Sequence, residues 1–491
     1  MTPWARRRYK RPDEPAAVES SDDEPPEPPG RTMDQTRPEC AGLSRTASLI
    51  RACDLLLALA ILLLMTGCGR DARPNILLIL LDTTRADHLS CYGYGRGTTP
   101  SLDSLAEAGT RFERAMSGSP WTLPSMATIF TGLTERSHKA RLSDGVFYGV
   151  DPGLPYLPEL LARSGYGTAA FFNVIYMSEH FGFHRGFEHF DCRGLEEVTQ
   201  SRSAGETVDA FLAWLATRDG EEAPFFAAVH FFDPHATYDP PSPYDTLYAD
   251  PDYSGLFDRD WGVMADMFDA NSGAVVVDSA GARNLVNLYD GELAYTDAEI
   301  GRLLGGLRAS GYGGSTLVIV IGDHGEEFGE HGRYTHGHSL HAELLDVPLI
   351  ISGCGVPSRQ VVEGLVGTID VAPTILAAAD VQAPEIMPGR SLLLPDHDPE
   401  RILAASGLGG GESREACVRQ AARKVIWNSD TGEAVMFDQA SDPGENAPLP
   451  PDDTLLQEVL YYWATPPDGQ PAAVPWSSAV TDQLRDLGYI R

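Results

Sequence analysis

Three strongly apolar segments, each ending in an aspartate, constrain the fold of this chain more than any other feature. They are residues 75–82 (NILLILLD), 224–233 (PFFAAVHFFD) and 315–323 (STLVIVIGD). A strand with such a continuous apolar run is buried on both faces, as in the centre of a parallel sheet. From Pro74 onward, apolar runs alternate with amphipathic stretches, so we predict an α/β fold with a large, doubly wound mixed sheet flanked by helices. Ligands bind at the carboxyl edge of such sheets, so Asp82, Asp233 and Asp323 are expected at one shared site.

The charge balance restricts the partners of the chain. Its 491 residues contain 37 Lys and Arg against 70 Asp and Glu, a formal net charge of −33. Such an acidic chain repels phosphate polymers, so we exclude nucleic acid as a partner. No apolar run reaches the roughly 18–20 residues of a spanning helix, which excludes a polytopic membrane protein. An acidic enzyme that acts on an anionic substrate needs a local positive centre, which points towards a metal ion.

Histidines and carboxylates are concentrated at and after the end of the third apolar segment. Residues 322–327 read Gly-Asp-His-Gly-Glu-Glu, and five of the 13 histidines fall at positions 324, 331, 336, 338 and 341. Imidazole and carboxylate groups at a strand end are typical ligands of zinc and related divalent metals. This segment therefore predicts a metal site.

Thr122 is the candidate nucleophile. Pro124 suits a first helical turn, and residues 126–132 continue as a short helix closed by a glycine, so Thr122 is expected at the helix N-terminus. Free N–H groups and the helix dipole stabilise phosphate-like groups there, and metal coordination can activate the hydroxyl. The alternative is that Thr122 merely caps the helix.

Four motifs together resemble the sulfatase family of the alkaline phosphatase superfamily. They are Asp82, Thr122-x-Pro124-Ser125, residues 322–326 (GDHGE) and residues 436–446 (MFDQASDPGEN). In sulfatases the nucleophile motif is Cys/Ser-x-Pro-Ser-Arg, with Thr-Gly following, and Thr131-Gly132 have the family's spacing from Thr122. The resemblance spans Pro74 to Arg491, and it implies the family fold, ester hydrolysis, and Thr122 at the nucleophile position.

Three departures from the sulfatase pattern bear on the reaction. Sulfatases convert the motif Cys or Ser to formylglycine, and Thr122 cannot supply that aldehyde. Thr83 stands where sulfatases have a second metal aspartate, and Met126 stands in place of the motif arginine. The set is more similar to the threonine-nucleophile branches, which are the nucleotide pyrophosphatases/phosphodiesterases and the phosphoethanolamine or phosphoglycerol transferases. Those branches use zinc or manganese and a phosphothreonine-type intermediate.

The resemblance also implies roles for the candidate residues. The expected metal ligands are Asp82, Thr122, Asp323 and His324. The expected catalytic residues are Thr122, His235 and His336. His338 and Asp233 are candidates for contacting the substrate or a second metal. Zinc or manganese is favoured as the divalent metal, with calcium, as in sulfatases, the alternative.

We therefore expect a metal-dependent hydrolase that cleaves a phosphate-type ester through a covalent threonine intermediate. Its substrate is expected to be a small anionic ester, with a lipid- or glycan-linked ester among the candidates. Three alternatives remain open: a phosphoethanolamine- or phosphoglycerol-type transferase, a sulfuric ester hydrolase proper, and a non-catalytic binding lipoprotein.

The amino-terminal residues predict export. Residues 1–45 are basic, then acidic and proline-dense, so we expect disorder or a mis-assigned start. Residues 46–68 combine a positive flank, an apolar run and a Met-Thr-Gly-Cys ending that resembles a bacterial lipobox. We expect Cys68 to carry lipid and to anchor a periplasm-facing lipoprotein to a membrane of the bacterial cell envelope. An uncleaved signal anchor is the alternative.

The rest of the chain divides into a catalytic domain, 74–400, and a C-terminal subdomain, 401–491. In the first, residues 290–307 predict a helix on the sheet with Glu292, Asp297 and Glu299 outward. In the second, residues 417–427 and 433–437 predict two strands around a turn, within the small antiparallel sheet that the resemblance implies.

Two smaller features complete the sequence. Residues 442–445 (DPGE) predict a capped turn rather than a catalytic motif. The cysteines show no metal-type spacing, so a zinc–thiolate site is not expected. In an exported protein Cys91, Cys192, Cys354 and Cys417 are candidates for disulfides, without a defined pairing.

Overall fold

The computed structural model describes residues 73–143, 145–193, 202–257, 262–393, 398, 401–407, 414–464 and 474. The expected start (1–45), the signal segment (46–68) and the lipidation site Cys68 lie outside these residues. Among the helices that are described, none has the length and apolar character needed to cross a membrane.

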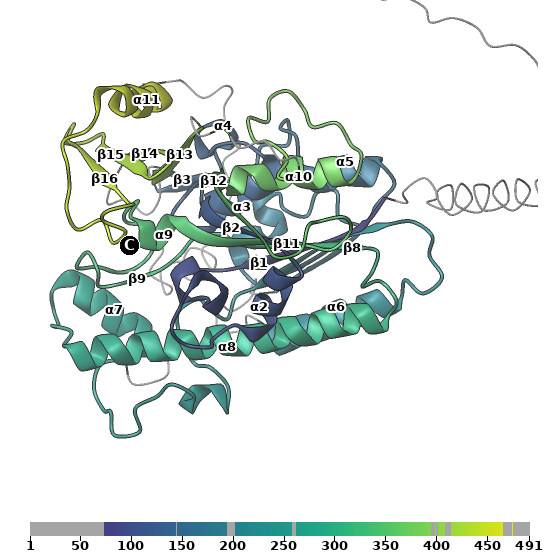
Figure 1. The fold of residues 1–491 in the computed structure, drawn as a ribbon, viewed down its shortest axis with the longest axis horizontal. Coiled ribbons are helices and arrows are strands. Elements are labelled where there is room, and N and C mark those ends of the chain that lie inside the picture. Colours follow the sequence, from purple (N-terminus) through teal and green to yellow (C-terminus); the bar gives the residue numbers. More distant parts are fainter. Residues whose placement is uncertain are drawn as a thin grey trace, which may run out of the picture. The chain divides into compact units, whose positions relative to one another are not determined.

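An eight-stranded sheet with the order β12-β2-β11-β8-β1-β7-β5-β6 forms the centre of the fold (Figure 1). Its strands are β1 (Asn75–Leu81), β2 (Gly109–Met116), β5 (Gly167–Phe172), β6 (His189–Cys192), β7 (Phe225–Phe231), β8 (Thr316–Gly322), β11 (Asp346–Ser352) and β12 (Gln360–Gly367). Strand β11 is antiparallel to both of its neighbours, and the other neighbouring pairs are parallel. The prediction of a large mixed sheet is confirmed.

The three apolar segments form the central strands β8, β1 and β7, which are adjacent and fully buried. Leu81 is in register with Gly322 on one side and with Phe231 on the other. The next residues of β1 and β8 are Asp82 and Asp323, so the register brings these two carboxylates together at the carboxyl edge of the sheet.

Helices cover both faces of the sheet, because the side chains of β1 alternate between two hydrophobic cores. Ile76, Leu78 and Leu80 pack with α3 (Thr122–Thr131), α5 (Leu157–Arg163) and α10 (Val371–Ala378). Leu77, Ile79 and Leu81 pack with α2 (Pro100–Glu107), α6 (Ala204–Ala216) and α8 (Ser279–Ala309). Figure 1 shows these two groups of helices on opposite sides of the strands. Helix α3, which begins at Thr122, therefore belongs to one layer, whereas the long helix α8 belongs to the other.

The predicted helix at 290–307 is confirmed as part of the longer helix α8, but the expected outward position of two of its acids is wrong. Glu292 and Asp297 are buried. Asp297 accepts hydrogen bonds from the backbone N–H groups of Ser101 and Leu102 at the start of α2, at 2.8 and 2.9 Å. Glu292 accepts one from the N–H of Asp239 at 2.7 Å. These carboxylates point inward because they satisfy backbone donors that would otherwise be buried without partners.

A second, antiparallel sheet with the order β13-β14-β15-β16 follows the eight-stranded sheet along the chain, as expected. Its strands are β13 (Ile402–Gly407), β14 (Glu415–Gln420), β15 (Arg423–Asn428) and β16 (Ala434–Asp438), and α11 (Asp453–Ala464) packs on it. The single strand predicted at 417–427 is wrong, because the chain reverses at Ala421. That residue takes a left-handed conformation (φ 52°) without the glycine or asparagine that usually marks such a turn.

Shorter elements connect these layers: β3 (Arg141–Ser143), β4 (Val146–Tyr148), β9 (Glu327–Phe328), β10 (Tyr334–Thr335), α4 (Glu135–His138), α7 (Gly262–Ser272) and α9 (Ala342–Leu345). The four candidate cysteines Cys91, Cys192, Cys354 and Cys417 are all unpaired.

Candidate active site and metal centre

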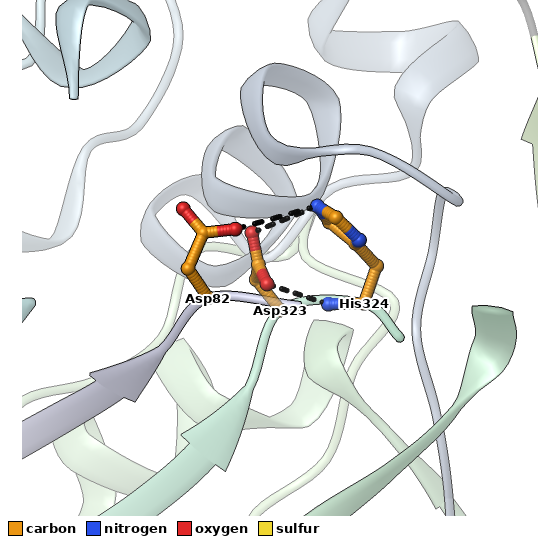
Figure 2. A group of neighbouring side chains, drawn as sticks. All are labelled: Asp82, Asp323 and His324. Atoms are coloured by element: carbon orange, nitrogen blue, oxygen red, sulfur yellow. Dashed lines mark hydrogen bonds and ion pairs between the residues drawn. The ribbon is translucent and has the colours of Figure 1, made fainter. Parts of the chain in front are cut away.

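Asp82, Asp323 and His324 form a fully buried group at the carboxyl edge of the sheet (Figure 2). His324 Nε2 lies 3.7 Å from Asp82 Oδ1 and 3.5 Å from Asp323 Oδ2. One ligand atom from each residue lies within 4.8 Å of the others. These three predicted metal ligands therefore converge on one point.

Hydrogen bonds fix the far side of each carboxylate. Asp82 Oδ2 accepts from His230 Nε2 at 3.1 Å. Asp323 Oδ1 accepts from the backbone N–H groups of His324 at 2.7 Å and Thr83 at 3.2 Å. The oxygens that face His324, Asp82 Oδ1 and Asp323 Oδ2, have no hydrogen-bond partner within the described residues. Two such buried oxygens beside an imidazole fit a divalent cation, which would give both of them a partner.

The pKa values of Asp82 and Asp323 also favour a divalent cation at this place. Burial raises the pKa of Asp82, but the hydrogen bond from His230 and the imidazoles of His235 and His324 outweigh it and lower that pKa to about 2. Burial and the charge of Asp82 raise the pKa of Asp323 well above its usual range. Adjacent buried carboxylates cannot both stay ionised without a compensating positive charge.

His324 is held as a neutral imidazole. Its Nδ1 lies 2.9 Å from the carbonyl of Gly325, so we assign the proton to Nδ1 and a lone pair to Nε2. Burial and the neighbouring His336 lower the pKa of His324 to about 3. A neutral imidazole with its lone pair directed at two carboxylates is the form that binds a metal.

Thr122 adds a hydroxyl to this group from helix α3. It is the first residue of α3 and is buried, and its Oγ lies 3.2 Å from His324 Nε2. The N-cap position belongs to Trp121, so the alternative that Thr122 merely caps the helix is wrong. Ser125 Oγ donates a hydrogen bond to the carbonyl of Asp323 at 2.6 Å, which ties the first turn of α3 to the carboxylate pair.

His336 lies next to His324, and His235 lies next to His336. The ring centroids of His336 and His324 are 4.5 Å apart, and those of His336 and His235 are 5.0 Å apart. His336 Nδ1 pairs with Glu326 Oε1 at 2.9 Å. Burial lowers the pKa of His336 to about 4 and raises that of Glu326 to about 7. The structure thus brings both predicted catalytic histidines to the candidate metal centre.

The two remaining candidate residues, Asp233 and His338, form hydrogen bonds or ion pairs with other groups. Asp233 Oδ1 accepts a hydrogen bond from the N–H of Ala204 at the start of α6, at 2.9 Å. His338 Nε2 pairs with Glu327 Oε2 at 2.9 Å. Neither belongs to the metal-binding group formed by the described residues.

Two residues beside the site were given no role by sequence reasoning, His230 and Thr83, and Glu326 was noted only as part of the segment 322–327. His230 stands inside a buried apolar strand, where a polar side chain needs a partner, and this was a usable signal. Thr83 was noted only because it stands where sulfatases have a second metal aspartate. Its hydroxyl donates to the carbonyl of Pro234 at 2.8 Å and so holds the turn that carries His235.

The chain is similar to known sulfatases. The profile of the family described as Sulfatase matches residues 74–381. An arylsulfatase of Clostridium perfringens is 25% identical over 452 residues, covering 79% of this chain and 92% of the relative. An uncharacterised sulfatase of Escherichia coli is 25% identical over 485 residues, covering 85% and 95%.

Solved structures share the fold. A protein in complex with its substrate D-glucosamine-2-N,6-O-disulfate superimposes with a TM-score of 0.65 at 19% identity, covering 81% of this chain and 100% of that one. A phosphonate monoester hydrolase of Silicibacter pomeroyi gives a TM-score of 0.64 at 20% identity, covering 79% and 94%. At these identities the likeness concerns the fold alone.

Proposed function

The chain belongs to the sulfatase family and is an ester hydrolase of the alkaline phosphatase superfamily, and from this premise we propose that it cleaves a phosphate-type ester through a covalent intermediate on Thr122. The observation that carries this proposal is the position of Thr122 Oγ, 3.2 Å from His324 Nε2, within the buried group of Asp82 and Asp323. No other hydroxyl among the described residues bonds to His324.

Asp82, Asp323 and His324 would hold a divalent cation, with Thr122 Oγ as a further ligand. When bound, the cation acts as a Lewis acid on the ester and lowers the pKa of the hydroxyl. Zinc or manganese is favoured over calcium, because an imidazole nitrogen suits transition metals whereas calcium prefers oxygen ligands.

The residues of the chain supply the rest of the chemistry. Thr122 Oγ forms the new bond to phosphorus while the bond to the leaving oxygen breaks, and the backbone N–H groups of the first turn of α3 stabilise the negative charge. The hydroxyl proton of Thr122 leaves to solvent before the attack. Glu326, whose pKa is raised to about 7, can hold a proton next to His336 Nδ1 and pass it through this imidazole to the leaving oxygen, so the pair is the candidate general acid. His235 is the candidate to contact a nonbridging oxygen. Water then releases the phosphate from the threonine, or an acceptor alcohol does so in the transferase alternative.

A sulfate or phosphonate ester is the second candidate substrate. Relatives named as sulfatases and a structural neighbour named as a phosphonate monoester hydrolase favour it. Against sulfate stands Thr122, because a sulfated threonine lacks the geminal hydroxyl with which formylglycine expels sulfate.

One panel of substrates tests these alternatives. The protein is stripped with a chelator, reloaded with zinc, manganese or calcium, and assayed on aryl phosphate, phosphodiester, phosphonate and sulfate esters. We expect the highest kcat/KM on a phosphate-type ester with zinc or manganese. Higher turnover of the aryl sulfate would overturn the phosphate proposal, and no turnover of any ester would favour a binding protein.

We also propose that the chain is an exported lipoprotein anchored through Cys68. The support is the sequence of residues 46–68 described above. Metabolic labelling with a palmitate analogue is expected to mark the wild type and not Cys68→Ala. Equal labelling of both would contradict the anchor.

A further inference from the structure

The candidate metal centre and the point where the chain enters the central sheet lie at opposite edges of that sheet. Asp82 and Asp323 follow the carboxyl ends of β1 and β8, whereas residues 73–74 lead into the amino end of β1. We call this opposite edge the amino edge. It is formed by the segments that lead into the seven parallel strands, which are residues 73–74, 104–108, 160–166, 187–188, 213–224, 306–315 and 353–359.

The chain is fixed to the amino edge from Arg73 onward. Arg73 donates a hydrogen bond to the carbonyl of Ser164 at 2.6 Å, and its guanidinium lies 5.1 Å from the centre of the Tyr166 ring. Tyr166 in turn donates its hydroxyl to the carbonyl of Pro74 at 3.0 Å. Since Ser164 and Tyr166 belong to the amino edge themselves, Arg73 is a fixed point of that edge.

The proposed lipid on Cys68 would tether this fixed point closely to a bilayer. A lipid chain on a residue holds that residue at the head groups. Whatever conformation residues 69–72 take, the five Cα–Cα steps from Cys68 to Arg73 reach at most about 17 Å. Strand β1, with 7 residues, spans about 23 Å. The carboxyl edge therefore cannot face the bilayer, because Arg73 would then lie farther from the head groups than the tether reaches.

The charge of the amino edge is compatible with a bilayer surface. The edge contains five acidic residues and five arginines: Arg73, Arg163, Arg218, Arg308 and Arg359. Four of these arginines are exposed, and the buried one, Arg218, pairs with Glu221 at 2.8 Å. These charges cancel, so the net charge of −33 arises from the rest of the chain. Because anionic head groups repel acidic surfaces, the balanced amino edge is favoured against a bilayer.

The amino edge is also made of short connections. A single residue, Ala108, joins α2 to β2, and residues 353–359 join β11 to β12. At the other end of the strands lie α7, β9 and the C-terminal sheet (Figure 1). Helix α8 runs between the two ends, and its 31 residues span about 46 Å. A flat surface can therefore approach the starts of the strands closely at the amino edge.

We propose that the amino edge of the central sheet is the surface that lies against the bilayer, and that the candidate active site faces the aqueous side and takes its ester from water. The head groups of the anchoring bilayer then cannot reach Thr122, because the sheet lies between them. A lipid-linked ester of that same bilayer is therefore excluded as the substrate. This inference rests on the proposed lipid anchor at Cys68.

Fluorophores at the two ends of the molecule test the orientation. Cys354 is an exposed cysteine of the amino edge, and Val276, just before α8, is 89% exposed at the other end. Two full-length lipoproteins are compared, one labelled at Cys354 and one labelled at Val276→Cys and carrying Cys354→Ser. In both, the less exposed Cys91, Cys192 and Cys417 are replaced by alanine.

Both proteins are placed in vesicles of phosphatidylethanolamine and phosphatidylglycerol that contain nitroxide-labelled head groups. We expect the label at Cys354 to lose most of its fluorescence and the label at position 276 to keep it, because nitroxide quenching acts over a short range. The same proteins with Cys68→Ala are the control, and neither label is expected to be quenched in them.

The outcomes separate the orientation from the anchor. Equal quenching at both positions, or stronger quenching at position 276, would overturn the membrane-facing amino edge and leave the anchor standing. A wild-type protein that carries no lipid on Cys68 and does not float with the vesicles would overturn the anchor and this inference together.

A pair of esters tests the consequence for the substrate. 4-Ethylphenyl phosphate stays in water, whereas 4-hexadecylphenyl phosphate inserts its chain into the vesicle that carries the protein. If the active site faced the bilayer, the anchor would raise the effective concentration of the long-chain ester at the site. We expect no such gain, so the hexadecyl-to-ethyl ratio of kcat/KM should be no higher for the anchored protein than for Cys68→Ala. A higher ratio would overturn the proposal. If neither ester is cleaved, the proposed chemistry fails, and the quenching measurement decides the orientation.

Discussion

His230 Nε2 lies 3.1 Å from one oxygen of the Asp82 carboxylate, while the other oxygen of that carboxylate lies 3.7 Å from His324 Nε2. Both histidines are fully buried, so the Asp82 carboxylate is held between them in a site without bulk water. His230 does not touch the reacting atoms. We propose that it is a positioning residue, which holds the Asp82 carboxylate so that its other oxygen faces the candidate metal centre.

We predict that His230→Leu weakens zinc or manganese binding by about 10- to 100-fold, the usual effect of removing a partner of a metal ligand. His230→Gln can still donate to Asp82 and should recover part of the affinity. Calorimetric titration of chelator-stripped protein measures this without relying on activity. Equal affinities in the wild type and the leucine variant would show that Asp82 needs no such support.

Thr122→Ala is expected to lower kcat/KM on the best ester by more than about a thousandfold while the metal still binds, because the attacking oxygen is gone but Asp82, Asp323 and His324 remain. Thr122→Ser keeps a hydroxyl and should retain measurable turnover. Mass spectrometry of the acid-quenched wild type is expected to find the phosphoryl group on the peptide that contains Thr122. Turnover by the alanine variant at the wild-type rate would remove the nucleophile assignment.

The positions of Asp82 and Asp323 were predictable because they follow from the order of the strands in the sheet. The apolar strands that end at Asp82 and Asp323 had to be central and parallel, and adjacent parallel strands bring their last residues together. The position of Thr122 at the start of its helix was predictable from the proline and glycine near the helix ends, whereas its assignment as the nucleophile came from the resemblance to the sulfatase family.

The supporting residues were not predictable in this way, because their roles depend on tertiary contacts. Asp297 reads as an exposed helix residue, yet it caps α2, which lies nearly 200 positions earlier in the chain. Asp233 ends an apolar strand as Asp82 does, but its carboxylate caps α6 instead of joining the metal group. Ala421 carries no turn signal, so the reversal between β14 and β15 was missed.

The burial of His138 leads to a prediction of how the stability of the folded protein depends on pH. It is fully buried next to α3, its Nδ1 accepts from the N–H of Ala140 at 3.1 Å, and burial lowers its pKa to about 3. The pKa of an unfolded histidine is about 6.5. Between these values the unfolded chain binds a proton that the native protein does not, so stability is lost as pH falls through this window.

The expected contribution of His138 is up to about 1.4 kcal/mol per pH unit between roughly pH 6 and pH 3.5. Urea unfolding of the chelator-treated protein at pH 7, 6 and 5 measures the slope. His138→Gln removes one titrating group and should flatten it. An unchanged slope would mean that His138 is protonated in the native protein.

Lys424 and Glu445 join the C-terminal sheet to the catalytic segment through a buried ion pair. Lys424 Nζ lies 2.6 Å from Glu445 Oε1 and donates to the carbonyl of Leu340 at 2.7 Å, and both side chains are almost fully buried. Glu445 Oε2 also lies 3.1 Å from His341 Nδ1 and accepts from the N–H of Ala342 at 3.1 Å. The turn that carries Glu445 is capped by Asp442, as predicted from the sequence.

Lys424→Met should therefore lower the free energy of unfolding by about 3–5 kcal/mol, because it leaves the Glu445 charge buried without its cation. The double variant Lys424→Met, Glu445→Gln removes both charges and is expected to regain most of that loss. Chemical denaturation of the wild type, both single variants and the double variant gives the coupling energy directly. A single variant that loses less than about 1 kcal/mol would show that the pair behaves like an exposed surface ion pair.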